Sequence, residues 1–283
     1  MKTLIITPFL NEELILKKSI ESILNLEVKP EKWILVNDGC TDNSLQIAED
    51  LCQNIDWISI ITLDTQNIKR NIGSKIISAF NKGLETVDHN DYDIIMKLDA
   101  DVILPTNYLK EIIRAFKSDD RIGICGGVCI LKDSLVREKV ANTDHLRGPI
   151  KAYRIECFNQ IEGLMEKMGW DSIDEYKAMY LNWKVKVIED LTVVHLKPTN
   201  VKIGFGRAGF KNGIMLYTIR FDIPLLMTNV LKRLLWKPYI IQGLGVLYGY
   251  CYAFLSREEK IIDKKLGKFI RKYRYSKIAA RFK

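Results

Sequence analysis

Short apolar runs alternate with amphipathic stretches along the first 130 residues of the chain. A short apolar run bounded by polar residues predicts a buried strand, and apolar residues on one helical face predict a helix. The predicted strands are Lys2–Thr7, Trp33–Val36, Ile58–Leu63, Ile94–Leu98 and Ile122–Leu131, and the predicted helices are Glu13–Leu24, Asp42–Cys52, Ile72–Glu85 and Asn107–Phe116. Strands that alternate with helices predict an α/β fold, a mainly parallel sheet flanked by helices.

The pattern changes near residue 201, where glycines and aromatic residues become frequent. Tyr239–Leu255 carries no charge over 17 residues, whereas Ile214–Leu231 is apolar but interrupted by charged residues and a proline. We interpret both as interfacial or re-entrant helices that lie on a bilayer. A soluble helical lobe and a membrane-spanning helix are the alternatives. We therefore predict two parts, 1–200 and a helical, membrane-associated segment 201–283.

Charge separates the end of the chain from the rest. The net charge is +8, and Ser256–Lys283 alone holds eleven Lys and Arg against three acidic residues. A basic tail after an apolar segment indicates an anionic membrane surface as partner. Nucleic acid is the alternative partner for a basic tail, but no nucleic-acid-binding motif accompanies the tail, so we expect no nucleic-acid partner.

The six cysteines form no CxxC pair and no disulfide-like spacing, and the chain starts with a strand-like run. These features are typical of a cytosolic protein without a secretory segment. Together with the basic tail, they predict a cytoplasmic protein that is peripheral to the inner face of the cell membrane.

Two carboxylates follow the predicted strand Ile94–Leu98, in the sequence Asp99-Ala100-Asp101. Alternation along an extended chain would place Asp99 and Asp101 on the same side, at the carboxyl edge of the sheet, where ligands bind in open α/β folds. Paired carboxylates suit Mn²⁺ or Mg²⁺ that carries a diphosphate. A solvated loop is the alternative.

Polar clusters also follow the first two predicted strands. The first strand leads into Thr7-Pro8-Phe9-Leu10-Asn11-Glu12 and the second into Asn37-Asp38-Gly39. Both clusters would lie on the same edge of the sheet as Asp99 and Asp101. The alternative roles are a tight turn at Asp38 and a helix start at Asn11.

Three motifs together resemble those of the family 2 glycosyltransferases, in order and spacing, over roughly residues 1–200: Pro8…Asn11-Glu12, Val36-Asn37-Asp38-Gly39-Cys40-Thr41-Asp42 and Asp99-Ala100-Asp101. The resemblance implies the GT-A fold, with a Rossmann-like mixed sheet. It also implies transfer of a hexose from a nucleotide diphosphate sugar, with a UDP-sugar favoured, usually with inversion. By the same resemblance the nucleotide site would comprise Thr7, Pro8, Asn11, Glu12, Asp38, Asp99, Ala100 and Asp101. Asp38 would bind the base and Asp101 would ligate Mn²⁺ or Mg²⁺.

One segment departs from the family pattern. The family's Asn-x-Gly…Ala-Arg-Asn-x-Gly stretch corresponds here to residues 71–83, about two residues longer, with Phe80 where arginine often stands. Lys69, Arg70 and Lys75 are the candidate replacements for a contact to the diphosphate.

The acceptor side should supply a general base. Residues 169–175 resemble the family's acidic motif at a helix start, and the spacing to Asn182-Trp183 favours Asp171 as the base, then Asp174, then Glu175. An N-cap role is the alternative for Asp171. His195 follows a strand-like run, where the resemblance implies a metal or diphosphate contact; a structural histidine is the alternative. His145 is a candidate for the border of the acceptor site.

The sequence thus predicts a glycosyltransferase that uses a nucleotide sugar, a divalent metal and a lipid-linked or surface-polysaccharide acceptor. A sugar-phosphate nucleotidyltransferase is the first alternative, but it would need a Gly-rich phosphate loop after the first strand. A non-catalytic membrane-binding module with a decayed transferase core is the second. The joint presence of Asp38, Asp99, Asp101 and Asp171 argues against decay.

Overall fold

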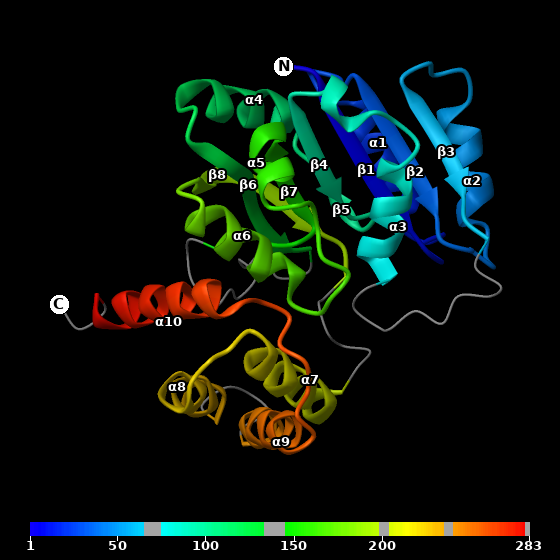
Figure 1. The fold of residues 1–283 in the computed structure, drawn as a ribbon. Helices are drawn as coiled ribbons and strands as arrows, with labels where there is room; N and C mark the ends of the chain where they lie inside the picture. Colours follow the sequence, from blue (N-terminus) through cyan, green and yellow to red (C-terminus); the bar gives the residue numbers. More distant parts are fainter. Residues whose placement is uncertain (65–74, 133–144, 198–203, 235–239, 281–283) are drawn as a thin grey trace. The chain divides into compact units, whose positions relative to one another are not determined.

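The computed structural model describes residues 1–64, 75–132, 145–197, 204–234 and 240–280 (Figure 1). The chain divides into two units, Met1–Lys197 and Pro198–Lys283. The boundary predicted between residues 200 and 201 falls outside the described residues. In the part of the chain that the structure describes, no helix has both the length and the apolar character needed to cross a bilayer.

The N-terminal unit is built on one eight-stranded sheet with the order β3-β2-β1-β4-β7-β6-β8-β5. Strands β3, β2, β1 and β4 run parallel to one another, and β7 runs antiparallel to both of its neighbours. This topology confirms the mixed, mainly parallel α/β sheet. The strands are β1 Thr3–Phe9, β2 Lys32–Asn37, β3 Ile58–Thr62, β4 Ile94–Leu98, β5 Val102–Ile103, β6 Ile122–Leu131, β7 Ile150–Arg154 and β8 Lys184–His195.

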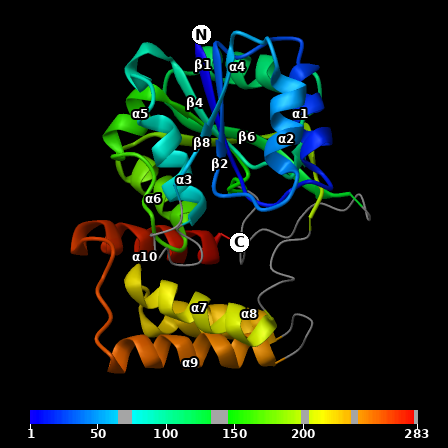
Figure 2. The same cartoon turned by 90° about the vertical axis from the view of Figure 1, so that its right-hand side faces the viewer.

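Helices cover both faces of this sheet (Figure 2). One hydrophobic core packs α1, α2 and α4 against one face, and a second packs α3, α5 and α6 against the other. Side chains along β1 alternate between the two cores, as the two-residue period of a strand requires. The helices are α1 Leu16–Leu24, α2 Ser44–Cys52, α3 Lys75–Leu84, α4 Tyr108–Ser118, α5 Ile155–Gln160 and α6 Trp170–Tyr180, with a short 3₁₀ helix η1 at His89–Asp91.

The order of the parallel strands brings three strand ends to one edge. Phe9 at the end of β1 lies beside Asn37 at the end of β2, and Ile6 of β1 lies beside Lys97 of β4. The segments that leave β1, β2 and β4 therefore begin next to one another. The turn after β2 needs Gly39, whose φ of +84° lies in the left-handed region that glycine adopts without strain.

The C-terminal unit consists of helices α7 Phe205–Thr218, α8 Ile223–Leu234, α9 Ile241–Leu255 and α10 Lys264–Ala279. Glycines allow α7 and α9 to pack closely. A Cβ added to Gly213 would lie 2.1 Å from the Val246 carbonyl oxygen, and one added to Gly249 would lie 2.0 Å from that of Phe210. The glycine-rich composition of this region thus reflects backbone contact between two helices.

Candidate active site

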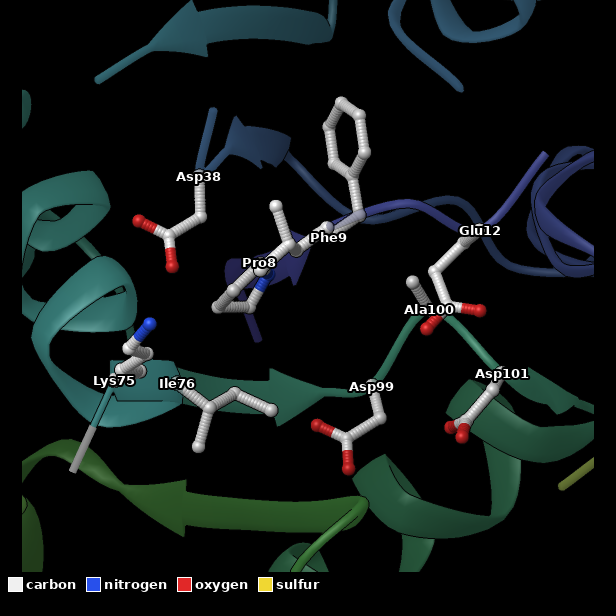
Figure 3. Close-up of a pocket in the computed structure, with 10 residues that line it drawn as sticks. Pro8, Phe9, Glu12, Asp38, Lys75, Ile76, Asp99, Ala100 and Asp101 are labelled. Carbon is white, nitrogen blue, oxygen red and sulfur yellow. The ribbon is translucent and has the colours of Figure 1, made fainter. Parts of the chain in front are cut away.

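A pocket of about 180 Å³ opens at the edge where β1, β2 and β4 end (Figure 3). The carboxylates of Asp38, Asp99, Asp101 and Glu12 surround its apolar floor, and Lys75, the first residue of α3, lies at its side. The lining residues are Pro8, Phe9, Leu10, Glu12, Asp38, Lys75, Ile76, Asp99, Ala100 and Asp101. The fold therefore brings most of the predicted nucleotide residues together, including Lys75; Lys69 and Arg70 lie outside the described residues.

Asp99 faces a buried cation. Its carboxylate pairs with Nζ of Lys97, which lies two residues earlier on β4 and is fully buried. Burial raises the pKa of Asp99, and the neighbouring Lys97 charge opposes that rise. The positive charge of Lys97 therefore lies behind the Asp99 carboxylate that lines the pocket.

Asp101 has a different partner from Asp99, because β4 ends at Leu98 and the chain turns at Ala100 and Asp101. After the turn, β5 pairs with β8, which sets Val102 beside His195. Oδ2 of Asp101 then lies 3.2 Å from Nε2 of His195. The predicted association of Asp101 with His195 is therefore present in the geometry, although Asp99 and Asp101 do not share one set of partners.

The donor atoms at Asp101 fit a divalent metal. Oδ1 of Asp101 is buried and has no hydrogen-bond partner among the described residues, so it is available as a ligand. A carboxylate oxygen with an imidazole nitrogen suits Mn²⁺. No group of three or more His, Cys, Asp or Glu side chains that could hold a metal occurs in the described ranges. Phosphate oxygens and water would have to complete the coordination shell.

Two residues predicted to bind nucleotide have other contacts. Thr7 is buried, and its Oγ1 accepts a hydrogen bond of 3.0 Å from the Trp33 indole. Asn11, with a φ of +54°, accepts a 2.8 Å bond from the Thr41 backbone and so ties the β1 turn to the β2 turn. Neither side chain lines the pocket. Glu12 does, and it pairs with Lys197.

The acidic motif at the start of α6 separates into exposed and buried carboxylates. Asp171 remains 32% exposed. Asp174 is buried and accepts bonds from Lys151 Nζ at 2.9 and 3.0 Å and from the Tyr153 hydroxyl at 2.5 Å. A general base must reach a proton on the acceptor, which the exposed carboxylate can do and the buried one cannot without breaking these bonds.

His145, the candidate for the border of the acceptor site, lies beside the acidic motif of α6. Its Nδ1 lies 2.8 Å from Oε2 of Glu175, and its Nε2 lies 3.9 Å from Oδ2 of Asp171. Burial disfavours the imidazolium, but the charge and hydrogen bond of Glu175 outweigh it and raise the pKa of His145. Glu175 is thus occupied as a partner of His145 and of Lys151, which lies 2.8 Å away.

Two buried lysines join the two halves of the site. Lys97 on β4 and Lys151 on β7 are directly opposite each other in the antiparallel pairing. Both ammonium groups lie near the ring of Trp170, at 5.0 and 5.8 Å from its centroid. Lys97 forms an ion pair with Asp99 and Lys151 forms one with Asp174, so each buried ammonium charge is balanced by a neighbouring carboxylate. Burial and the opposing charges of Asp174 and Glu175 act against each other on Lys151, and the net effect raises its pKa.

Curated proteins with similar sequences are polysaccharide synthases. The poly-beta-1,6-N-acetyl-D-glucosamine synthase of Staphylococcus epidermidis is 26% identical over 193 residues, which covers 63% of this chain and 44% of that protein. The enzyme of the same name from Staphylococcus aureus strain COL is 26% identical over 189 residues, 62% of this chain and 43% of its own length. The chain thus spans less than half the length of these relatives.

Solved structures share the fold at lower identity. The mannosyltransferase PcManGT from Pyrobaculum calidifontis, in complex with GDP-Man and Mn²⁺, aligns with a TM-score of 0.62 at 14% identity, over 91% of this chain and 88% of that one. TarS 1–349 from S. aureus, in complex with UDP-GlcNAc, aligns with a TM-score of 0.58 at 16% identity, over 90% and 73%. These alignments confirm the GT-A architecture.

The family profile described as Glycosyl transferase family 2 matches residues 4–166. This range is more than half of the chain and runs from β1 beyond α5, so it contains the pocket and all of its lining residues. The chain belongs to glycosyl transferase family 2.

Proposed function

We propose that this protein is a glycosyltransferase that moves a sugar from a nucleotide diphosphate sugar, with a UDP-sugar favoured, to an acceptor hydroxyl with inversion. The observation that carries the proposal is the convergence of Asp38, Asp99 and Asp101 on one pocket at the ends of β2 and β4. Family membership supports it, as do the nucleotide sugars in the complexes of PcManGT and TarS.

The pocket has suitable chemistry for each part of the donor. The Asp38 carboxylate can accept hydrogen bonds from a base, and selectivity arises because an unpaired buried polar group costs about 1–3 kcal/mol. Lys75, in the first turn of α3, supplies positive charge for the diphosphate, to which the amino end of the helix adds. Asp101 and His195 would hold Mn²⁺ or Mg²⁺, which neutralises the leaving diphosphate when bound.

Asp171 is the proposed general base. It removes the proton from the acceptor hydroxyl as the acceptor oxygen bonds to the anomeric carbon and the bond from that carbon to the diphosphate breaks. A single displacement of this kind inverts the anomeric configuration. The exposure of Asp171 and the buried bonds of Asp174 support this assignment.

We further propose a lipid-linked or surface-polysaccharide acceptor and a cytoplasmic location at the inner face of the cell membrane. The names of the staphylococcal relatives support the acceptor class. Exposed apolar side chains on α8 and α9, among them Ile223, Leu244, Tyr248 and Phe254, support interfacial binding. Sedimentation with neutral and anionic vesicles tests this, and failure to bind either would contradict it.

The donor site is tested by thermal shift with UDP, GDP, CDP and dTDP, each with Mn²⁺ and with a chelator. A ligand at a hundred times its dissociation constant stabilises a protein by about 2.7 kcal/mol, which is readily measured. We expect one nucleotide to stabilise the wild type only with Mn²⁺, and Asp101→Asn to abolish the effect. Asp91→Asn is the matched control, since Asp91 is exposed and precedes β4 rather than following it. A shift that is equal with chelator, or unchanged in Asp101→Asn, would contradict the metal-dependent site.

A further inference from the structure

The C-terminal unit contains a pocket of its own, of about 480 Å³, between the connection from α7 to α8 and the first turns of α10. This volume lies in the range of small-molecule sites. Five of the lining side chains are basic and one is acidic: Arg220, Lys260, Lys264, Lys268 and Arg271 against Asp222. The pocket therefore concentrates positive charge in a concave surface.

The one acidic side chain is already engaged. Oδ1 of Asp222 accepts a 2.8 Å bond from the Tyr275 hydroxyl, and Oδ2 lies 3.7 Å from Nε of Arg271. Within the described residues of the C-terminal unit, no carboxylate forms an ion pair with Lys264 or Lys268. Among the described residues, Arg220 and the three lysines of the pocket form no ion pair, so their positive charge exceeds the single negative charge of Asp222.

The positive charge of the pocket affects the pKa of Lys260. Its Nζ donates a 2.8 Å hydrogen bond to the Tyr217 carbonyl oxygen. Burial and the nearby Arg220 lower the pKa of Lys260 to about 8. A bound anion would reverse this effect, because opposite charge favours the protonated amine.

Arg220, one of the lining residues, is held in place by several contacts. Its φ of +63° is left-handed, a conformation that usually requires glycine or asparagine at the end of a helix. Its Nε donates a 2.7 Å bond to the Ile262 carbonyl oxygen, and Arg271 donates a 2.8 Å bond to the carbonyl oxygen of Arg220. Gly267 leaves room for it, since a Cβ there would lie 2.7 Å from Cδ of Arg220.

We propose that this pocket binds a dianionic phosphate group, as a phosphomonoester or a diphosphate. Several cations around one concavity match the charge and the many acceptor oxygens of phosphate better than those of a single carboxylate. The amino end of α10 is already capped by Asp263, whose side chain accepts a 2.7 Å bond from the Leu266 backbone, so the side-chain cations of the pocket would hold the anion. The phosphate would come from a soluble compound or from a phospholipid headgroup, and it binds in a different unit from the proposed donor pocket.

The test compares two double variants of the full chain. Lys264→Gln with Lys268→Gln removes two exposed lysines of the pocket. Lys265→Gln with Lys272→Gln removes two exposed lysines of the same helix that do not line it, so the net charge changes equally. Calorimetric titration with inorganic phosphate, diphosphate and glycerol 3-phosphate probes a soluble ligand. Flotation with phosphatidylcholine vesicles, with and without phosphatidic acid, probes a headgroup.

We expect the Lys264→Gln, Lys268→Gln variant to lose about tenfold or more in affinity for at least one of these probes, because it loses charge-assisted hydrogen bonds to the phosphate. The affinity of the Lys265→Gln, Lys272→Gln control should stay near that of the wild type. Loss confined to the soluble phosphates assigns a soluble source, and loss confined to phosphatidic acid assigns a lipid headgroup. Equal weakening in both variants would show general attraction to the basic tail and overturn the proposal. Absence of binding to every probe by the wild-type protein would overturn it as well. Neither result depends on the donor site, which the nucleotide titration tests separately.

Discussion

The two carboxylates that compete for the role of base can be separated by one pair of substitutions, Asp171→Asn and Asp174→Asn. Breaking a buried ion pair costs about 3–5 kcal/mol. Lys151 retains Glu175 at 2.8 Å when Asp174 is neutralised, so the lower end, about 3 kcal/mol, applies. A domain of this size shifts by about 2–4 °C per kcal/mol, which predicts that Asp174→Asn melts about 6–12 °C lower.

Asp171→Asn should instead keep the stability of the protein and lose its activity. Its side chain is 32% exposed and lies 3.9 Å from His145, a weak ion pair worth about 1 kcal/mol or less. Its melting temperature should therefore change by no more than about 4 °C. Loss of a general base should lower the transfer rate by about 10²–10⁴-fold.

The assay is nucleotide release in the presence of acceptor, measured well below both melting temperatures, alongside thermal unfolding of each variant. Asp174→Asn should retain most of the activity of its folded fraction. An Asp174→Asn protein that is stable but inactive, together with an active Asp171→Asn protein, would refute the assignment and the structural reasoning behind it.

Three further predictions concern other parts of the chain. His145→Gln should lower the free energy of unfolding most below pH 6.5, the ordinary pKa of histidine, where the wild-type imidazolium interacts with Glu175. The difference from wild type should shrink as the pH rises through the raised pKa of folded His145, because the wild type then loses this charge interaction. A difference in urea unfolding that does not depend on pH would contradict this. Gly249→Ala should destabilise the protein by about 1–3 kcal/mol in thermal unfolding, because the new Cβ would clash with the Phe210 backbone. Gly206→Ala is the control: its Cβ would meet Ile241 at 3.7 Å, an ordinary contact, so the free energy of unfolding should rise by about 0.5–1 kcal/mol. Lys75→Gln should weaken nucleotide diphosphate binding about tenfold by calorimetry, with Lys82→Gln on the same helix as the unaffected control.

Much of the N-terminal fold could be predicted from sequence because its strands carry a clear apolar signal. Ile94–Leu98 and Ile122–Leu131 occur with the predicted bounds, and the other predicted strands differ by one to two residues at their ends. The strand β7 was missed. Its sequence Ile-Lys-Ala-Tyr-Arg looks exposed, and only tertiary partners for Lys151 make its burial possible.

The site was predictable where one strand end carries several polar residues, and less so where contacts cross between distant segments. The pairing of Asp101 with His195 depends on β5, a strand of two residues with no period to detect. His145 and Glu175 are 30 residues apart in the chain, so no local sequence pattern predicts their contact. Thr7 and Asn11 were predicted to bind nucleotide, but their side chains accept hydrogen bonds from Trp33 and Thr41, which lie 26 and 30 residues away in the chain. Their predicted role therefore stays a prediction.

The facing lysines of β4 and β7 have a consequence for how this sequence can change over time. Lys97 pairs with Asp99, whereas Lys151 pairs with both Asp174 and Glu175, and a lone buried charge of either sign is strongly unfavourable. Positions 97 and 99 should therefore vary as a pair among relatives, and position 151 should vary together with positions 174 and 175. A replacement that leaves either lysine without any carboxylate should be strongly destabilising unless the lysine changes as well. These positions should therefore show correlated variation in any sufficiently deep set of related chains.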